Sequence, residues 1–164
     1  MINDPLLQQM KKIKLTNNKY TLVDDEDYKY LSQFKWIYRR GYATRFVYFK
    51  NSNKGYALHR EVIKVKKNQM LDHINRNTLD NRKNNLRICN KAQNAMNCKI
   101  HKHNTSGYKG VSWFRTSKKW RAYIVISNKQ KHLGLFKTKK DAAIAYNTSA
   151  KKLFGEFANL NVIK

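Results

Sequence analysis

Hydrophobic and polar positions alternate in short runs through the first half of the chain, a pattern that predicts strands rather than long helices. Four such runs are present: 20–23, 35–39, 42–49 and 56–59. Residues 1–14 show little pattern and are predicted to form a weak tail. The four carboxylates at 24–27 favour one or two helical turns, because acidic side chains stabilise a helix N-terminus. A cation site is the alternative for this cluster.

Two further runs, 70–73 and 85–89, predict a pair of strands around a polar loop. Asn90, with Gln93 three residues later, resembles a capping box, so a helix is expected to begin near Lys91. Residues 99–106 are polar and basic without periodicity, which is typical of a linker.

The last third of the chain has the clearest pattern. Strands are predicted at 108–115, 119–127 and 131–136, with Trp120, Ala122, Ile124 and Ile126 alternating onto one face. Thr138 and Asp141 form a second capping signal. Helical spacing then relates Ala142, Ala145, Tyr146, Ser149, Ala150 and Leu153, and Gly155 is the expected stop. This pattern predicts a three-stranded antiparallel sheet packed on one helix.

The predicted fold class is therefore α+β, with a strand-rich first domain over residues 1–98, a linker at 99–106 and a second domain over 107–164. The composition supports folded domains, since 41% of the 164 residues are apolar and 12% are aromatic.

Charge narrows the set of partners. The chain has 35 Lys and Arg against 10 Asp and Glu, a net charge of +25, divided as +11 over residues 1–89 and +14 over 90–164. A field of this sign favours an anionic partner, and nucleic acid fits best. The longest apolar runs have five residues, whereas spanning a bilayer takes about 20, so no membrane association is expected.

Two cysteines cannot make a four-thiolate zinc site or a disulfide framework. With no signal-peptide pattern, we expect a cytoplasmic, non-secreted protein. No protein partner is evident.

The run from Leu71 to Asn94 carries the candidate chemistry. Asp72 offers the hard oxygen that Mg²⁺ prefers, and Asn94 can add a neutral oxygen near the start of the predicted helix. His73 supplies an imidazole, whose ordinary pKa of about 6.5 suits a general base at neutral pH. A metal site with two protein ligands leaves room for water and phosphate oxygens. The alternative is a polar hairpin with an ordinary surface histidine.

The same run resembles the HNH endonucleases of the ββα-metal type, and the resemblance extends upstream to Leu58-His59-Arg60 and to residues 23–28. It covers roughly residues 15–100. It implies that Asp72 and Asn94 bind the metal and that His73 activates water. Asn85, or its neighbour Asn84, would be the central asparagine that braces the loop and orients the histidine.

By the same resemblance His59 and Arg60 support the site or contact phosphate. The implied cofactor is Mg²⁺, with Mn²⁺ or another divalent cation as alternatives, because many relatives have His in place of Asn94. The implied products are a 5′-phosphate and a 3′-hydroxyl.

Residues 104–161 resemble the plant ethylene-response-factor DNA-binding domain, through Gly107-Tyr-Lys-Gly-Val111, Lys119-Trp-Arg-Ala122, His132-Leu-Gly134 and the motifs at 142–146 and 154–160. In that family the sheet lies in the major groove. The resemblance implies DNA contacts from Lys109, Ser112, Trp113, Phe114, Arg115, Lys119, Arg121, Tyr123, Val125, Gln130 and His132. A basic, solvated sheet face is the alternative, and Trp113 is equally compatible with burial.

Together these features predict a metal-dependent endonuclease of the homing or phage type, acting on double-stranded DNA held by a C-terminal β-sheet module. A non-cutting, sequence-specific DNA-binding regulator is the runner-up, since it would use the same basic sheet. An RNA-binding protein would explain the charge but not the catalytic run.

Overall fold

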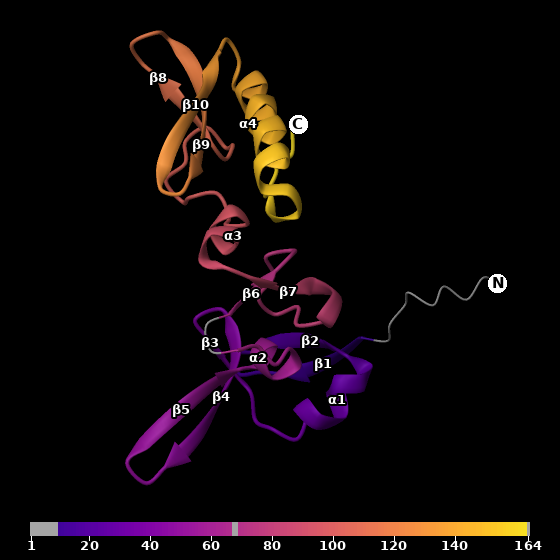
Figure 1. The fold of residues 1–164 in the computed structure, drawn as a ribbon. Helices are drawn as coiled ribbons and strands as arrows, with labels where there is room; N and C mark the ends of the chain where they lie inside the picture. The colour runs from indigo at the N-terminus through magenta and orange to yellow at the C-terminus, as the bar shows by residue number, and fades with distance from the viewer. Residues whose placement is uncertain (1–9, 67–68, 164) are drawn as a thin grey trace, which may run out of the picture. The chain divides into compact units, whose positions relative to one another are not determined.

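The computed structural model describes residues 10–66 and 69–163, and the chain divides into two compact units on either side of the Asn90–Lys91 bond (Figure 1). The fold is mixed α and β, with several small sheets. Among the described residues no helix is both long and apolar enough to cross a membrane.

The first unit begins with a two-stranded antiparallel sheet of β1 (Met10–Lys14) and β2 (Tyr20–Asp24), followed by α1 (Asp25–Leu31). Residues 10–14, predicted as part of a weak tail, are therefore a strand. Their pattern was too short to signal one, because Ile13 is the only apolar side chain of β1 that is buried. The helix expected after the acidic cluster is confirmed, with Asp25, Glu26 and Asp27 in its first turn.

A three-stranded antiparallel sheet follows, in the order β3 (Ile37–Arg39), β4 (Tyr42–Phe49) and β5 (Ser52–Ala57). The strand predicted at 56–59 is wrong at its end, because the short helix α2 (Leu58–Val62) begins at Leu58. Leu58 is fully buried, and Glu61 pairs with Arg45 of β4 at 3.1 Å. These tertiary contacts draw the helix onto the sheet.

The core of this unit consists of apolar side chains from the β1–β2 and β3–β5 sheets, from α1 and α2 and from the connecting segments: Ile13, Leu15, Val23, Leu31, Trp36, Ala43 and Leu58. Trp36 is anchored inside it, since its ring Nε1 donates a hydrogen bond of 2.8 Å to the Leu31 carbonyl.

The predicted strand pair is present as β6 (Met70–His73) and β7 (Leu86–Cys89), which pair antiparallel with Asp72 opposite Arg87 and His73 opposite Leu86. Asn85, predicted as the first residue of the second strand, lies instead in a 3₁₀ turn, η1 (Lys83–Asn85). The strand β6 ends at His73, as the entry to the loop requires.

The second unit starts with α3 (Lys91–Met96), which begins where the capping signal predicted it. Its sheet has the order β10 (Lys129–Phe136), β9 (Lys119–Ile126) and β8 (Val111–Phe114), all antiparallel. The helix α4 (Lys139–Phe154) packs on this sheet and leads into η2 (Gly155–Phe157). The predicted three-stranded sheet with one helix is confirmed (Figure 1).

The ends of α4 are those predicted: the Thr138 side chain accepts from the Asp141 N–H at 3.1 Å, and Gly155 ends the helix at φ +53°. Its buried stripe differs from the predicted one, since Ala143 and Phe154 are buried as well, whereas Leu153 is exposed. The strand predicted from 108 starts only at Val111, because Gly110 adopts a left-handed φ of +72° just before it.

Candidate active site

The loop between β6 and β7 is held in shape by Asn85. Its Nδ2 donates to the Asp80 carbonyl (2.7 Å) and to Asn75 Oδ1 (3.0 Å), while its Oδ1 accepts from the Asn75 N–H (3.0 Å). A buried amide that uses both its oxygen and its nitrogen in this way rigidifies the backbone it spans. These contacts suit the bracing role predicted for Asn85, which stays a prediction.

The loop is also attached to the N-terminal sheet. The Leu22 N–H donates to the Leu79 carbonyl (2.8 Å), and the Asn81 N–H donates to the Leu22 carbonyl (2.9 Å), so residues 79–81 pair with β2 as a short parallel extension. Nearby, Asp24 Oδ2 accepts from the Lys83 N–H at 2.7 Å. Strand β2 therefore supports one side of the loop.

His73 lies at the end of a buried chain of hydrogen bonds that starts on β2. The Thr21 hydroxyl donates to the Leu79 carbonyl (2.8 Å), Asn81 Nδ2 donates to Thr21 Oγ1 (2.6 Å), and Asn81 Oδ1 is 2.9 Å from His73 Nε2. Thr21, Asn81 and His73 are 0%, 1% and 5% exposed. That Asn85 orients the histidine, as the resemblance implies, stays a prediction; one hydrogen bond to the His73 ring comes from Asn81.

The same series of hydrogen bonds also indicates which nitrogen of His73 carries the proton. The Leu79 carbonyl can only accept, so the Thr21 hydroxyl proton points to it and Thr21 Oγ1 must accept from Asn81 Nδ2. That contact turns Asn81 Oδ1 toward the imidazole. Because an amide oxygen only accepts, the neutral His73 ring holds its proton on Nε2 and its lone pair on Nδ1.

Two aromatic rings lie against His73. The His59 ring, from α2, lies edge-on with its centroid 5.3 Å away, and the Tyr42 ring, from β4, lies 6.2 Å from His73 and 5.6 Å from His59. Both elements belong to the first unit, so the loop, the sheet and α2 converge on one imidazole.

Burial keeps both histidines neutral. It lowers the pKa of His73 below 6.5, against the opposing effects of the Asn81 hydrogen bond and of the Asp72 and Asp80 charges. Burial, the neighbouring His73 and Arg60 together lower the pKa of His59 to about 4. A neutral imidazole is the form that can accept a proton from water.

Asp72 faces a cation of the protein itself. Its Oδ2 accepts from Arg87 Nε (3.0 Å) and from Arg87 Nη2 (2.8 Å), across the β6–β7 pair, and both side chains are largely buried. No three His, Cys, Asp or Glu side chains gather into a metal cluster within residues 10–66 and 69–163. A carboxylate and an amide oxygen are nevertheless the kinds of ligand that Mg²⁺ prefers.

The other residues singled out by the HNH resemblance are dispersed. Asn94 lies on α3 in the second unit, and its pairing with Asp72 stays a prediction. Arg60 is exposed, and both of its terminal nitrogens lie 3.4 Å from the Gln69 carbonyl. Asn84, the alternative central asparagine, is exposed in η1.

The second unit presents most of its predicted DNA contacts on the sheet face opposite α4. Arg121 is central: its guanidinium lies 5.6 Å from the Phe114 ring and 5.4 Å from the Tyr123 ring, and Nη2 donates to Ser112 Oγ at 3.3 Å. A shallow depression on this face is lined by Phe114, Arg121, Gln130, His132 and Leu135. Val125 is exposed on the same face, and Arg115 and Lys119 are exposed around the β8–β9 turn.

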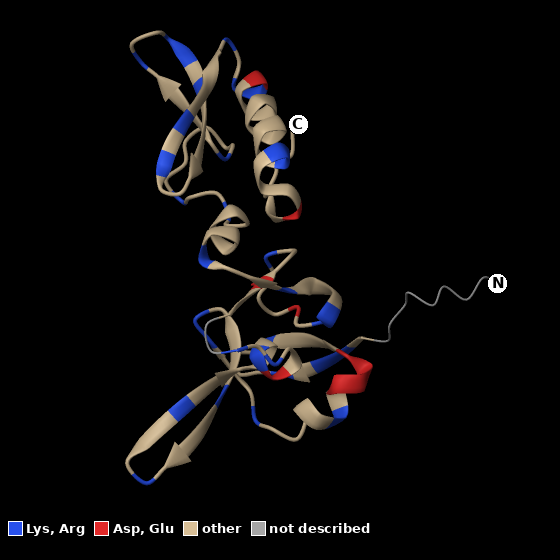
Figure 2. Ribbon diagram, viewed as in Figure 1, with Lys and Arg blue, Asp and Glu red and all other residues tan. Residues whose placement is uncertain are grey.

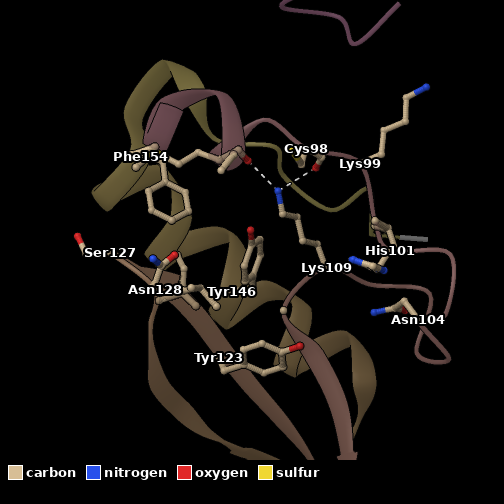
Figure 3. A pocket seen from close by; sticks show the side chains of 17 residues that line it. Cys98, Lys99, His101, Asn104, Lys109, Tyr123, Ser127, Asn128, Tyr146 and Phe154 are labelled. Carbon is tan, nitrogen blue, oxygen red and sulfur yellow. Dashed lines mark hydrogen bonds between the residues drawn. The ribbon is translucent and has the colours of Figure 1, made fainter. Parts of the chain in front are cut away.

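Two of the predicted DNA contacts do not lie on that face. Lys109 precedes β8, and its ammonium donates to the Met96 carbonyl (2.7 Å) and to the Cys98 carbonyl (2.9 Å), as Figure 3 shows. It borders a cavity of about 370 Å³. Trp113 is opposite Trp120 in the β8–β9 register, with ring centroids 5.2 Å apart, and therefore belongs to the helix-side face.

Sequence reasoning missed Thr21, Tyr42, Asn81 and Arg87. Thr21 and Tyr42 lie far from the motif, and a single strand pattern says nothing about which loop it supports. Asn81 is one of 19 asparagines, and no local signal separates it from Asn84. Arg87 was missed because the predicted strands, 70–73 and 85–89, would place Leu86 opposite Asp72, whereas β7 begins one residue later.

Two known proteins are similar to this chain. Protein 3.8 of Escherichia phage T7 is 34% identical over 94 residues, which are 57% of this chain and 77% of that protein. A protein of Acanthamoeba polyphaga mimivirus, named uncharacterized HNH endonuclease L560, is 29% identical over 151 residues, 88% of this chain and 75% of that protein. No family model matches the chain, and no solved structure matches it significantly.

Proposed function

Since this chain belongs to the same protein family as protein 3.8 of Escherichia phage T7, and a more distant relative is named an HNH endonuclease, we propose that it is a metal-dependent DNA endonuclease. The observation that carries the proposal is the buried Thr21–Asn81–His73 chain, which gives His73 one tautomer next to the carboxylate of Asp72.

His73 is the general base in this proposal. The neutral imidazole takes a proton from water, the water oxygen attacks the phosphorus, and the bond from phosphorus to the 3′-oxygen breaks. The products are a 5′-phosphate and a 3′-hydroxyl. Asn81 keeps the ring in the Nε2–H tautomer while this happens, and the ring of His59 excludes water from one side of the imidazole.

Asp72 and Asn94 would hold the divalent cation, Mg²⁺ or Mn²⁺, which neutralises charge on the scissile phosphate and on the leaving oxygen when bound. Asn85 braces the loop. Arg60 would contact phosphate in this proposal, which its exposure on α2, the helix that also carries His59, supports.

DNA is held, in this proposal, by the sheet face of the second unit that carries Arg121, Gln130 and His132. This face has the arginine, amide and imidazole groups that contact phosphates and base edges. Lys109 and Trp113 are left out of it, since the structure places them elsewhere.

The test is nicking of supercoiled plasmid DNA and of phage genomic DNA by the purified chain, in Mg²⁺, in Mn²⁺ and in EDTA. We expect cutting in either metal, none in EDTA, and a loss of at least 100-fold for His73→Ala. His103→Ala, an exposed histidine of the second unit, is the matched control and should cut normally.

Tight DNA binding without cutting in either metal would reject the enzyme and favour the non-cutting regulator. If His73→Ala cuts as well as the unmodified chain, His73 is not the base. Products with a 3′-phosphate would reject the proposed direction of hydrolysis.

A further inference from the structure

The hairpin of β4 and β5 continues beyond the sheet to which it belongs. Strand β3 pairs with β4 only from Arg39 opposite Tyr42 to Ile37 opposite Thr44, whereas the β4–β5 pairing runs on to Phe49 opposite Ser52. Residues 45–56 therefore form a ribbon of two strands, which extends away from the rest of the first unit (Figure 1). A ribbon of this kind is marginally stable in water unless something packs on it.

The end of the ribbon exposes large aromatic side chains. Tyr48 is 77% exposed and Phe49 is 55% exposed, and as neighbours in a strand they point to opposite faces. Behind Tyr48, the Phe46 ring lies 6.4 Å away on the same face and covers Gly55, whose missing Cβ would be 3.2 Å from it. The tip therefore exposes one large aromatic ring on each of its faces, and exposed apolar rings of this size indicate a surface that contacts a partner.

The charged residues of the ribbon itself are all basic, and one of them, Arg45, is paired with Glu61 of α2. No acidic residue occurs between Tyr28 and Arg60 in the sequence, and the ribbon itself carries Lys50 in its turn and Lys54 on β5. At its base, the Arg39 guanidinium lies 5.0 Å from the Phe46 ring. Figure 2 shows blue segments and no red along the hairpin.

We propose that the β4–β5 ribbon is a DNA-contacting element that enters the major groove, with Tyr48 and Phe49 against bases and sugars and with Lys50 and Lys54 against phosphates. The proposal rests on the proposed function in that DNA is the substrate. It adds a contact surface distinct from the β8–β10 face and from the site at His73.

The dimensions favour the major groove. Two paired strands lie about 4.8 Å apart before side chains are added, and the major groove, about 12 Å wide, admits such a ribbon, whereas the minor groove is about 6 Å wide. The tip also offers Asn51, Ser52 and Asn53, whose side chains can donate to and accept from base edges. A second copy of the chain is disfavoured as the partner, because its net charge is also +25.

The experiment measures binding of the full chain to a fluorescein-labelled 30-bp duplex of mixed sequence, in EDTA so that nothing is cut. Tyr48→Thr combined with Phe49→Thr should weaken binding about 10-fold or more, because aromatic contacts to nucleic acid are lost while threonine preserves strand propensity. Lys50→Gln combined with Lys54→Gln should make the log–log salt slope shallower by about 2, as expected for two lost phosphate contacts.

Matched controls come from the same unit. Tyr20→Thr removes an exposed strand tyrosine, and Lys12→Gln combined with Lys14→Gln removes two exposed strand lysines. Both should bind within about twofold of the unmodified chain. Circular dichroism of every variant establishes that the fold is kept. If the aromatic variant unfolds, the lysine variant and its control decide the proposal alone.

Competition identifies the groove when the unmodified chain is compared with the aromatic tip variant: methyl green, which occupies the major groove, should weaken binding of the unmodified chain more than that of the variant, and netropsin, which occupies the minor groove, should affect neither. Equal losses in the tip and control variants, or displacement by netropsin alone, would overturn the proposal. Normal DNA binding by the tip variants would also overturn it. If the unmodified chain then binds vesicles of phosphatidylcholine and phosphatidylglycerol and the tip variants do not, the partner of the ribbon is a membrane surface.

Cutting assays separate this proposal from the proposed function. A chain that never cuts but needs the tip for binding keeps the ribbon proposal and loses the nuclease. If cutting depends on His73 but the variants without the tip aromatics and lysines bind DNA normally, the nuclease proposal is kept and the ribbon proposal is rejected.

Discussion

The orientation of His73 depends on two uncharged residues, Asn81 in the same loop and Thr21 on another sheet. Asn81 accepts from the ring, and Thr21, on another sheet, determines which end of the Asn81 amide faces the ring. Neither side chain is expected to touch substrate. Both are therefore positioning residues, and their replacement should change the histidine rather than the affinity for DNA.

Thr21→Val tests the Thr21–Asn81–His73 hydrogen bonds, because it deletes the hydroxyl and leaves the side-chain volume nearly unchanged. Asn81 loses the acceptor that fixes its amide, so we expect cutting to slow about 10-fold, and Asn81→Ala to slow it about 100-fold. Thr21→Ser keeps the hydroxyl and should cut at close to the normal rate. Rates are measured on plasmid DNA at saturating Mg²⁺.

Nitrogen NMR of the His73 side chain distinguishes positioning from a general loss of structure. We expect the Nε2–H tautomer to dominate in the unmodified chain and in Thr21→Ser, and a mixture of tautomers in Asn81→Ala. Slow cutting by Asn81→Ala with an unchanged tautomer would contradict the assignment, as would equal losses from Asn84→Ala, which alters an exposed neighbour.

His59 makes the stability of the first unit depend on pH. Burial, His73 and Arg60 hold its pKa at about 4 in the folded state, against about 6.5 when unfolded. The unfolded chain thus binds the proton more readily, so stability is complete above pH 6.5 and falls as the pH drops from 6.5 toward 4. The shift corresponds to about 2 kcal/mol lost between pH 7 and pH 5.

Urea unfolding followed by Trp36, with Trp113 and Trp120 replaced by Phe, measures this loss. His59→Gln should remove most of the pH dependence, and the remainder should have the same sign, because the pKa of His73 is also lowered. A pH dependence of full size in His59→Gln would assign the effect to another group.

At the scale of elements, the sequence pattern predicted the helices and strands whose stabilising contacts lie between residues close together in the chain. The Thr138 cap, the β9 alternation and the start of α3 follow from a few adjacent residues. Strand β1 and helix α2 could not be predicted in this way, because Ile13 and Leu58 acquire their places only from a core shared with Val23 and Leu31.

Gly110 shows how one residue determines where an element begins. A Cβ there would lie 2.1 Å from the Tyr146 ring and 2.5 Å from the Tyr123 carbonyl, in addition to the strain of φ +72°. We expect Gly110→Ala to destabilise the second unit by about 3 kcal/mol or more. Urea unfolding followed by Trp113 and Trp120 fluorescence measures the change.

Gly107 supplies the control, since it has a similar φ of +78° but no atom within 4 Å of its missing Cβ. Gly107→Ala carries the backbone strain alone and should cost about 1 kcal/mol. Equal costs at the two positions would mean that β8 and α4 separate easily enough to absorb the clash.

At the scale of the whole molecule, the charge indicates a polyanionic partner but not a target sequence. With +14 on residues 90–164 and only two acidic residues there, contacts with phosphates should dominate affinity. If roughly 8 phosphates are neutralised, the logarithm of the binding constant should fall with the logarithm of salt concentration with a slope of about −7.

Fluorescence anisotropy between 50 and 300 mM KCl, in EDTA, measures that slope. A slope shallower than about −3 would mean that most of the basic residues face away from the DNA. The Tyr48→Thr and Phe49→Thr variant should keep the slope of the unmodified chain, since it removes no charge.

The candidate site was predictable where the motif is contiguous and unpredictable where the fold completes it. Asp72, His73 and Asn85 lie together in one hairpin, as their spacing indicates. The residues that surround them, from β2, β4 and α2, occupy positions set by the packing of the whole first unit. A single sequence has no record of such long-range pairing.

The attachment of the β6–β7 loop to β2 limits which segment of this protein can be transferred to another protein with the site intact. A segment from Leu58 to Asn94, moved into another protein, would carry the Asp72, His73 and Asn85 side chains but leave Thr21 behind. The host would have to offer its own strand edge with a hydroxyl at the matching position, or the Asn81 amide would lose the acceptor that fixes its direction toward the imidazole. Recombination at a boundary before β1 keeps Thr21 together with Asn81 and His73. Recombination at the borders of the motif transfers the motif residues without the strand that orients His73.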